Sequence, residues 1–419
     1  MHTRRWLFVL LIAVLVLPTL AIAPFAGAQE GPPQVGLRPD APPYALHGPY
    51  WVGLKDSAIT FEYSDGTTRE SRVSVWYPAQ NPGGALQPYT YTPEQRVLDY
   101  SGTLYLPRTL TALLDAAPDM AAAPYPVVIF SHGGWAYRWH LPQYVENLAS
   151  HGFVVIATDH QDAPPDWVMT GHKELTRQWD VRALIDYAGQ ITAADGVLPG
   201  VADMERVGVT GYSAGGFTAL LAGGARRSSA AKEEWCALDV VINSWVGPLL
   251  CTDAGAREQE WATLLGVDQP ADGLWPDISD PRVDAIVSID GGAFDFGPEG
   301  LGAINVPALL FFARGAPGEL PYPLDTLFDA LHHDKEVVVI FEYANHALFS
   351  PLCSEGMLSA QTVGDCAQPV WDRPRSHDLF NHLATAFFLA TLSDDPDAAA
   401  ALAPDVARFP GITYQATGF

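Results

Sequence analysis

Short, continuous apolar runs recur through the middle and C-terminal parts of the sequence. Such runs are typical of strands that are buried on both faces of a parallel sheet. We assign strands to Tyr125–Phe130, Phe153–Ala157, Val207–Thr210, Ala285–Ile289, Ala308–Phe312 and Val337–Phe341. Helical patterns lie between them at Leu141–Ser150, Leu175–Tyr187 and Gly216–Ala225. This alternation predicts an α/β fold with a mostly parallel central sheet that helices flank on both sides.

Two earlier segments have the apolar-polar alternation of strands with one buried face. They are Ala58–Tyr63 and Ser71–Tyr77, which we expect to form an antiparallel start to the sheet. Residues 29–48 are rich in Pro and Gly and predict an extended lead-in without its own core. We place the α/β domain at 49–393 and a C-terminal tail at 394–419.

Residues 226–281 interrupt the alternation after the helix that is predicted at Gly216–Ala225. This insertion contains four tryptophans and two of the four cysteines. It is either a lid over the active site or a disulfide-linked segment that only packs against the domain. The sequence leaves both interpretations open.

The N-terminus has the pattern of a signal peptide. Arg4 and Arg5 precede an apolar run from Trp6 to Ala23, and Ala26-Gly27-Ala28 is a small-residue cleavage site. We predict cleavage after Ala28, because prolines interrupt the run, although its length is near that of a membrane anchor. The mature chain is then secreted or periplasmic and has no stable membrane insertion.

The four cysteines all follow this segment, which suits an oxidising compartment. Their local spacing favours disulfides between Cys236 and Cys251 and between Cys353 and Cys366. A zinc site is disfavoured, because the tight C-x-x-C spacing is missing.

Composition narrows the class of partner. The 419 residues are 48% hydrophobic and 17% charged, as in a globular protein, and 48 Asp plus Glu exceed 23 Lys plus Arg, giving a net charge of −25. Loss of Arg4 and Arg5 with the signal removes two positive charges and gives −27. Such a surface repels nucleic acid and anionic lipid headgroups, so a neutral substrate is expected. Nothing in the sequence specifies an oligomeric state.

The candidate nucleophile is Ser213, in Gly211-Tyr212-Ser213-Ala214-Gly215 between a predicted strand and a predicted helix. A serine on this strained strand-to-helix turn projects its hydroxyl outward, and the small glycines let the backbone pass close to its neighbours. The helix N-terminus behind it favours a developing oxyanion.

A second motif, Ser131-His132-Gly133-Gly134, ends the strand at Tyr125–Phe130. Acyl transfer needs two backbone N–H groups directed at the oxyanion, and we assign them to Gly134 and Ala214. His132 is interpreted as a residue that orients this loop. Trp135 and Tyr212 are assigned to the substrate pocket, although such aromatic residues are as often packing anchors.

A serine nucleophile needs a general base, which in this chain order follows the serine and the acid. We assign the base to His346, which comes just after the last predicted strand. His332 and His333 fit an exposed turn before that strand, and His377 and His382 fit a final helix.

The acid is assigned to Asp290, which directly follows the strand Ala285–Ile289 and so emerges at the edge of the sheet. Glu319 and Asp325 lie after the next strand, where this acid is also found, and Asp295 is a nearby alternative. The residues alone leave these three open.

Several segments resemble a known family. Tyr125–Gly134, Leu148–Ile156, Val207–Gly216 and Val75–Pro78 are similar to the secreted platelet-activating-factor acetylhydrolases and to bacterial hydrolases described as predicted dienelactone hydrolases. The resemblance implies an α/β-hydrolase fold. It also implies the roles of Ser213, Asp290, His346, Gly134 and Ala214 given above. Tyr212 departs from the histidine common at that position in the family, and the insertion at 226–281 is absent from the animal lipoprotein enzymes.

Together these features predict a secreted serine carboxylic-ester hydrolase that works through an acyl-enzyme without a cofactor. The expected substrates are short-chain or phospholipid-like acyl esters. The alternatives are a polyester or cutinase-like hydrolase, a serine peptidase, and a non-catalytic binding protein on a hydrolase scaffold.

Overall fold

The computed structural model describes residues 31–419, which belong to one unit, with the exception of several short ranges. The ranges left out are 64–65, 92–93, 97–102, 106–107, 135, 162–169, 244–245, 252–253, 271–272, 316–323 and 351–369. The expected signal peptide at 1–28, Trp135, Glu319 and the expected Cys353–Cys366 disulfide therefore lie outside the described residues. Within the described ranges, no helix combines the length and hydropathy that a membrane span requires.

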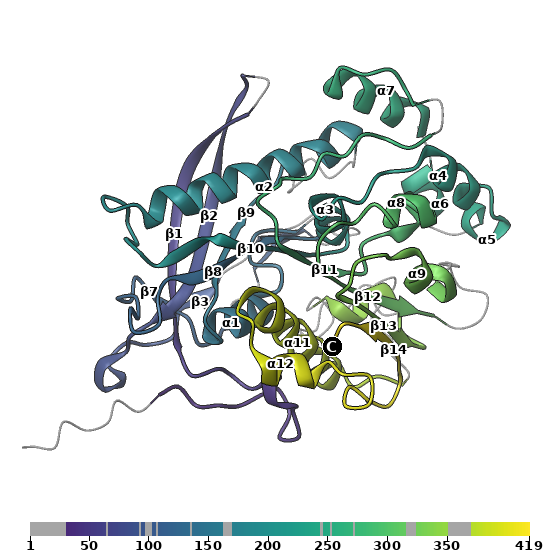
Figure 1. Cartoon of the computed structure of the whole chain (residues 1–419). Coiled ribbons are helices and arrows are strands. Elements are labelled where there is room, and N and C mark those ends of the chain that lie inside the picture. The colour runs from purple at the N-terminus through teal and green to yellow at the C-terminus, as the bar shows by residue number, and fades with distance from the viewer. Residues whose placement is uncertain are drawn as a thin grey trace, which may run out of the picture. The chain divides into compact units, whose positions relative to one another are not determined.

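A ten-stranded sheet forms the centre of the unit, with the strand order β14-β13-β12-β11-β10-β8-β9-β2-β1-β7 (Figure 1). The strands from β9 to β13 in this order pair in parallel: β9 (Val154–Thr158), β8 (Tyr125–Ser131), β10 (Ala202–Tyr212), β11 (Ala285–Ile289), β12 (Ala308–Arg314) and β13 (Glu336–Glu342). All six predicted apolar runs fall on these strands, so the predicted parallel sheet is confirmed.

Successive residues of one strand face two separate cores. Val127 and Ile129 of β8 belong to the core under α2 (Gly171–Thr192) and α3 (Ala214–Ala222). Val128 and Phe130 belong to the opposite core. That core is covered by α1 (Pro142–Ser150), α11 (Arg373–Leu392) and α12 (Pro396–Ala401). Burial on both faces explains why these strands are continuously apolar.

Antiparallel pairs flank the parallel strands on both sides, and the short edge strand β7 (Leu113–Leu114) then pairs with β1 in parallel. β1 (Trp51–Glu62) pairs with β2 (Thr68–Ala79), as predicted, and β2 pairs with β9. At the other edge, β14 (Ile412–Thr417) pairs with β13. Residues 394–419 are therefore not a separate tail, because they contribute α12 and the last strand of the sheet.

The remaining elements are short and lie in the connections. The strands are β3 (Thr90–Tyr91), β4 (Glu94–Arg96), β5 (Thr103–Tyr105), β6 (Arg108–Thr109) and β7 (Leu113–Leu114). The short helices are η1 (Pro43–Ala45), η2 (Pro82–Gly84), η3 (Ala293–Asp295), α8 (Gly297–Leu301), α9 (Leu324–Ala330) and η4 (His346–Phe349). The lead-in is tied to α11, where the Asp378 carboxylate accepts the N–H groups of Leu37 and Arg38 at 2.8 and 2.9 Å.

In its described residues the insertion contains four helices: α4 (Ser229–Cys236), α5 (Asp239–Ile242), α6 (Val246–Cys251) and α7 (Ala254–Leu265). The expected disulfide between Cys236 and Cys251 is present and joins α4 to α6. α7 packs against α2, where Trp261 Nε1 donates to Glu174 at 3.1 Å. These are contacts of a packed segment, and a lid movement stays a prediction.

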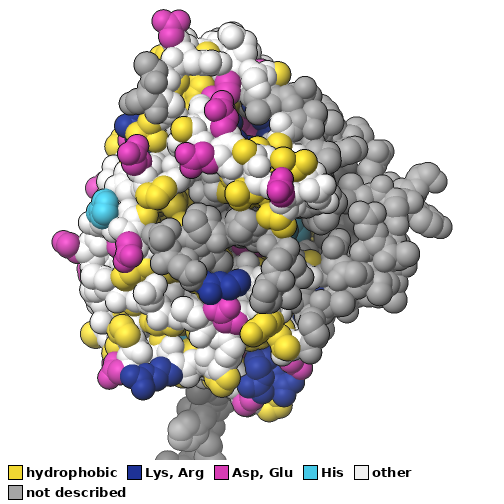
Figure 2. Space-filling model, turned by 90° about the vertical axis from the view of Figure 1, so that its right-hand side faces the viewer, with side chains coloured by type: hydrophobic (Ala, Val, Ile, Leu, Met, Phe, Trp, Pro, Cys, Tyr) yellow, Lys and Arg dark blue, Asp and Glu magenta, His cyan; other side chains and the backbone are white. Residues whose placement is uncertain are grey.

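The surface reflects the acidic composition. On the face drawn in Figure 2, Asp and Glu side chains are spread widely, whereas Lys and Arg lie mainly in its lower half. Apolar side chains are scattered between them.

Candidate active site

Ser213 lies at the sharp turn between β10 and α3. It is the residue before the first turn of α3, and its backbone has φ 57° and ψ −118°. A positive φ is unfavourable for a residue with a Cβ, so the surrounding structure must hold this conformation. The Ser213 N–H donates to the Ile289 carbonyl of β11 at 2.8 Å, which fixes the turn against the neighbouring strand.

Gly211 before Ser213 and Gly215 after it make this turn possible. A Cβ on Gly215 would lie 1.9 Å from the Ser131 carbonyl oxygen, and a Cβ on Gly211 would lie 2.4 Å from the carbonyl of Gly215. Any side chain at either position would force the backbone apart. The Gly-x-Ser-x-Gly spacing is therefore a packing requirement of the turn.

His346 and Asp290 complete a hydrogen-bonded relay with Ser213. Nε2 of His346 lies 2.8 Å from Ser213 Oγ, and Nδ1 lies 2.5 Å from Asp290 Oδ2. A carboxylate accepts, so Nδ1 carries a proton and Nε2 can take the hydroxyl proton of Ser213. The three residues follow the carboxyl ends of β10, β11 and β13, which lie on the same side of a parallel sheet.

The Asp290 carboxylate is buried and held by the backbone. Its residue follows β11 with φ 52°, and its N–H donates to the Phe311 carbonyl at 2.8 Å. Oδ1 accepts the Ala313 N–H at 3.2 Å, which leaves Oδ2 for His346. The His346 side chain is 46% exposed, whereas the Asp290 side chain is 2% exposed. Solvent and substrate can thus reach the imidazole, while the carboxylate is shielded.

The alternative acids have other surroundings. Asp295 lies 2.8 Å from Lys232 Nζ in the insertion, and that ion pair is nearly buried. Asp325 belongs to α9, and Glu319 is outside the described residues. Of the acids in the described ranges, Asp290 is the one whose carboxylate is hydrogen-bonded to His346.

The alternative bases also have other partners. The Lys335 N–H donates to His333 in a turn. His377 donates to the Leu348 carbonyl at 3.0 Å, and the Tyr44 N–H donates to His382 at 3.2 Å. His332 lies against Gly302, in the connection between α8 and β12.

Tyr212 contacts His346. The two rings stack with centroids 4.9 Å apart and planes 23° apart, and the Tyr212 hydroxyl donates to the His346 carbonyl at 2.9 Å. Only 4% of Tyr212 is exposed, so it offers little surface to a substrate. Tyr212 therefore supports the imidazole in place of its expected role in the substrate pocket. The expected pocket role of Trp135 stays a prediction.

The two expected oxyanion donors lie near each other beside Ser213. Ala214 is the first residue of α3, and the N–H of a first helical residue has no partner within its helix. A Cβ on Gly134 would lie 4.0 Å from the Ala214 Cβ. Both residues are half-buried, and their role as oxyanion donors stays a prediction.

His132 is fully buried beneath this loop. Its Nδ1 donates to the Gly133 carbonyl at 2.6 Å, and its Nε2 accepts the His160 N–H at 3.0 Å. Burial, with the neighbouring His160 and Arg177, lowers the pKa of His132 well below its usual value. His132 is therefore a neutral residue of the loop, and its two ring nitrogens have partners other than Ser213.

Known proteins match parts of this chain. Residues 41–188 match the family model of platelet-activating factor acetylhydrolase, isoform II. The platelet-activating factor acetylhydrolases of Cavia porcellus and of Bos taurus are each 29% identical over 127 residues. That stretch is 28% of this chain and 28% of each relative, so the chain spans under a third of the length of these relatives. The expected resemblance is confirmed; the family match includes Gly134 and ends before Ser213.

Among solved structures, a ferulic acid esterase from Streptomyces cinnamoneus matches with a TM-score of 0.56 and 21% identity. The match covers 87% of this chain and 96% of that chain. At this identity the likeness establishes the fold, which is that of the α/β-hydrolases.

Proposed function

We propose that the chain is a serine carboxylic-ester hydrolase that acts outside the cytoplasm through Ser213, His346 and Asp290. The observation that carries the proposal is the continuous relay of hydrogen bonds from Asp290 through His346 to Ser213, at a strained turn where the His346 side chain is 46% exposed. The resemblance to platelet-activating factor acetylhydrolases supports the same reaction class.

Acylation begins when Ser213 Oγ attacks the carbonyl carbon of the ester and His346 Nε2 takes the hydroxyl proton. The carbonyl oxygen becomes negatively charged and accepts the N–H groups of Gly134 and Ala214. His346 then gives its proton to the leaving alkoxide as the carbon–oxygen bond breaks. Asp290 stabilises the charged imidazole throughout and keeps Nδ1 protonated.

Deacylation uses the same groups in the opposite direction. A water molecule gives a proton to His346 and attacks the acyl carbon, and the bond to Ser213 Oγ breaks. His346 returns the proton to Ser213, and the carboxylic acid leaves. Atoms and charges balance with ester and water alone.

The net charge of −25 favours neutral substrates over anionic ones. We therefore place short-chain acyl esters first and phospholipid-like acyl esters second. Polyester and peptide substrates are the alternatives that a substrate panel separates.

Labelling with a fluorophosphonate tests the reaction class, because the probe reacts only with an activated serine. We expect labelling of Ser213 in the wild type, and none in Ser213→Ala or His346→Ala. Both variants should also lose hydrolysis of p-nitrophenyl acetate. Folded wild-type protein without labelling or turnover would contradict the proposal.

A panel of p-nitrophenyl acyl esters, an acetylated phospholipid, methyl ferulate, a polyester film and a peptide amide then tests the substrate class. The highest kcat/KM is expected for a short acyl ester. Faster hydrolysis of the film or the amide would favour an alternative substrate class.

A further inference from the structure

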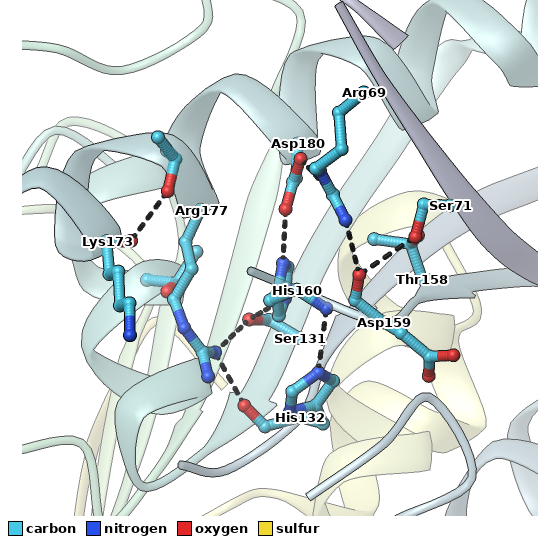
Figure 3. A network of polar contacts seen from close by, with 12 residues as sticks. Arg69, Ser71, Ser131, His132, Thr158, Asp159, His160, Lys173, Arg177 and Asp180 are labelled. Carbon is cyan, nitrogen blue, oxygen red and sulfur yellow. Dashed lines mark hydrogen bonds and ion pairs between the residues drawn. The ribbon is translucent and has the colours of Figure 1, made fainter. Parts of the chain in front are cut away.

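A second hydrogen-bonded chain of serine, histidine and aspartate side chains lies under the loop Ser131–Gly134, which we call the oxyanion loop (Figure 3). Ser131 Oγ is 2.9 Å from His160 Nε2, and His160 Nδ1 is 2.7 Å from Asp180 Oδ2. These residues come from the end of β8, the loop after β9, and α2. They are between 0% and 2% exposed, so no substrate can reach this serine.

Asp180, the last residue of this hydrogen-bonded chain, is held by the positive charge of Arg69 and by a hydroxyl group. Asp180 Oδ1 accepts Arg69 Nη2 at 2.6 Å and the Tyr63 hydroxyl at 2.5 Å. Burial alone would raise the pKa of Asp180, but hydrogen bonds from His160 and Tyr63 and the charge of Arg69 hold it below its usual value. The carboxylate is thus ionised and orients His160.

Arg177 joins this chain to the oxyanion loop. Its Nη1 donates to Ser131 Oγ at 3.1 Å and to the His132 carbonyl at 2.6 Å, and its Nη2 lies 3.4 Å from the Gly133 carbonyl. Since the Asp180 carboxylate accepts from His160 Nδ1, Nε2 of the neutral imidazole is the acceptor of the Ser131 hydroxyl proton. Arg177 and Asp180 are one helical turn apart on α2, so both side chains lie on the same face of that helix.

These contacts determine where the loop N–H groups point. In a trans peptide, the carbonyl of one residue and the N–H of the next point in opposite directions. The Gly133 carbonyl is drawn inward by His132 Nδ1 and Arg177 Nη2. The N–H of Gly134 is therefore turned away from the buried network, which is the direction that an oxyanion donor requires.

We infer that Arg177 is a positioning residue for the oxyanion hole, and that the buried Ser131–His160–Asp180 chain holds its guanidinium in place. The inference rests on the proposed function. A rigid donor needs little reorganisation when the negative charge develops, so this network contributes to transition-state stabilisation without touching the substrate.

The test measures kcat, KM and the inhibition constant of a trifluoromethyl ketone for Arg177→Met, with the sites titrated by fluorophosphonate. Removing one oxyanion donor lowers kcat by about 100- to 1,000-fold, so its misdirection should cost about 10- to 100-fold. KM should stay nearly constant. The ketone forms an oxyanion on Ser213, so its inhibition constant should rise in parallel.

Arg177→Lys keeps a charged donor and should recover part of kcat and of ketone affinity. Ser131→Ala removes one Arg177 contact and leaves the two carbonyl contacts, so it should have a smaller effect. Should Arg177→Met fail to fold, these two variants carry the test.

The matched control is Arg227→Met. Arg227 is buried to the same extent as Arg177, but it pairs with Glu258 of the insertion at 2.6 Å. We expect lower thermal stability with an unchanged kcat per titrated site.

Unchanged kcat per site and ketone affinity in the Arg177 and Ser131 variants would overturn the inference while leaving the proposed function intact. A wild type that neither hydrolyses esters nor labels at Ser213 would overturn both.

Discussion

Tyr212 offers a test of how the base is held. The imidazole of His346 is 46% exposed and has two described supports besides Ser213, which are the Asp290 carboxylate and the Tyr212 ring. Tyr212→Phe removes the hydroxyl bond to the His346 carbonyl and keeps the stack. A net hydrogen bond contributes about 0.5–1.5 kcal/mol, which corresponds to a fall in kcat of about 2- to 10-fold if all of it is expressed in the transition state.

Tyr212→Ala also removes the stack, which is worth about another 0.5–1.5 kcal/mol. The two losses together, about 1–3 kcal/mol, predict a fall of about 5- to 160-fold in kcat. KM should hardly change, because Tyr212 is 4% exposed. The assay is p-nitrophenyl acetate hydrolysis per fluorophosphonate-titrated site.

The control is Tyr144→Phe, which removes a buried hydroxyl bond to Thr210 at 3.0 Å and should affect stability only. A higher KM with unchanged kcat in Tyr212→Ala would refute this reasoning and return Tyr212 to the substrate pocket.

Four further predictions concern the acid, the turn, pH and the insertion. Asp290→Asn should lower kcat by about 1,000- to 10,000-fold, because the neutral amide no longer fixes the Nδ1–H tautomer, whereas Asp325→Asn should retain most activity in the same ester assay. Gly215→Ala should abolish fluorophosphonate labelling, because its Cβ would lie 1.9 Å from the Ser131 carbonyl oxygen; Gly189→Ala in α2, whose Cβ meets nothing within 4 Å, should raise the unfolding free energy by about 0.5–1 kcal/mol. Burial lowers the pKa of His151 and His382 from 6.5 to about 4. Between pH 6.5 and about 4, these histidines bind protons in the unfolded chain but not in the folded chain. Acidification in this range should therefore lower the unfolding free energy by about 1.4 kcal/mol per pH unit for each histidine. Thermal melts of His382→Asn should show a smaller dependence of stability on pH, and an identical dependence would contradict the assignment. Replacing Cys236 and Cys251 with Ala should lower the unfolding free energy by about 3 kcal/mol in denaturant titrations, since the disulfide closes a loop of 15 residues.

The parallel strands could be predicted because burial on both faces leaves an unbroken apolar run. β14 was missed although Ile412–Thr417 alternates apolar and polar residues, as an edge strand with one covered face does. Its alternation is a weaker signal than a continuous run, and its pairing with β13 depends on the chain returning past α11 and α12.

The relay residues could be predicted because chain order and strand ends restrict where each one falls. The role of Tyr212 could not be predicted, since its contacts depend on where the loop after β13 places His346. The buried chain was equally hidden. Ser131, His160 and Asp180 lie far apart in sequence, and a polar residue after a strand or on a helix usually faces solvent.

Comparison of the two serines shows why a serine beside a histidine and an aspartate is not by itself a nucleophile. Ser131 ends a regular strand, is 0% exposed, and accepts a hydrogen bond from Arg177. Ser213 has a positive φ that turns its hydroxyl out of the sheet, and its histidine is open to solvent. Attack on an ester needs access to the serine oxygen, and of these two serines only Ser213 combines an exposed histidine with a turn that presents the hydroxyl. The same three side chains thus hold a loop in one place and are arranged for proton transfer in the other, according to the backbone that carries the serine.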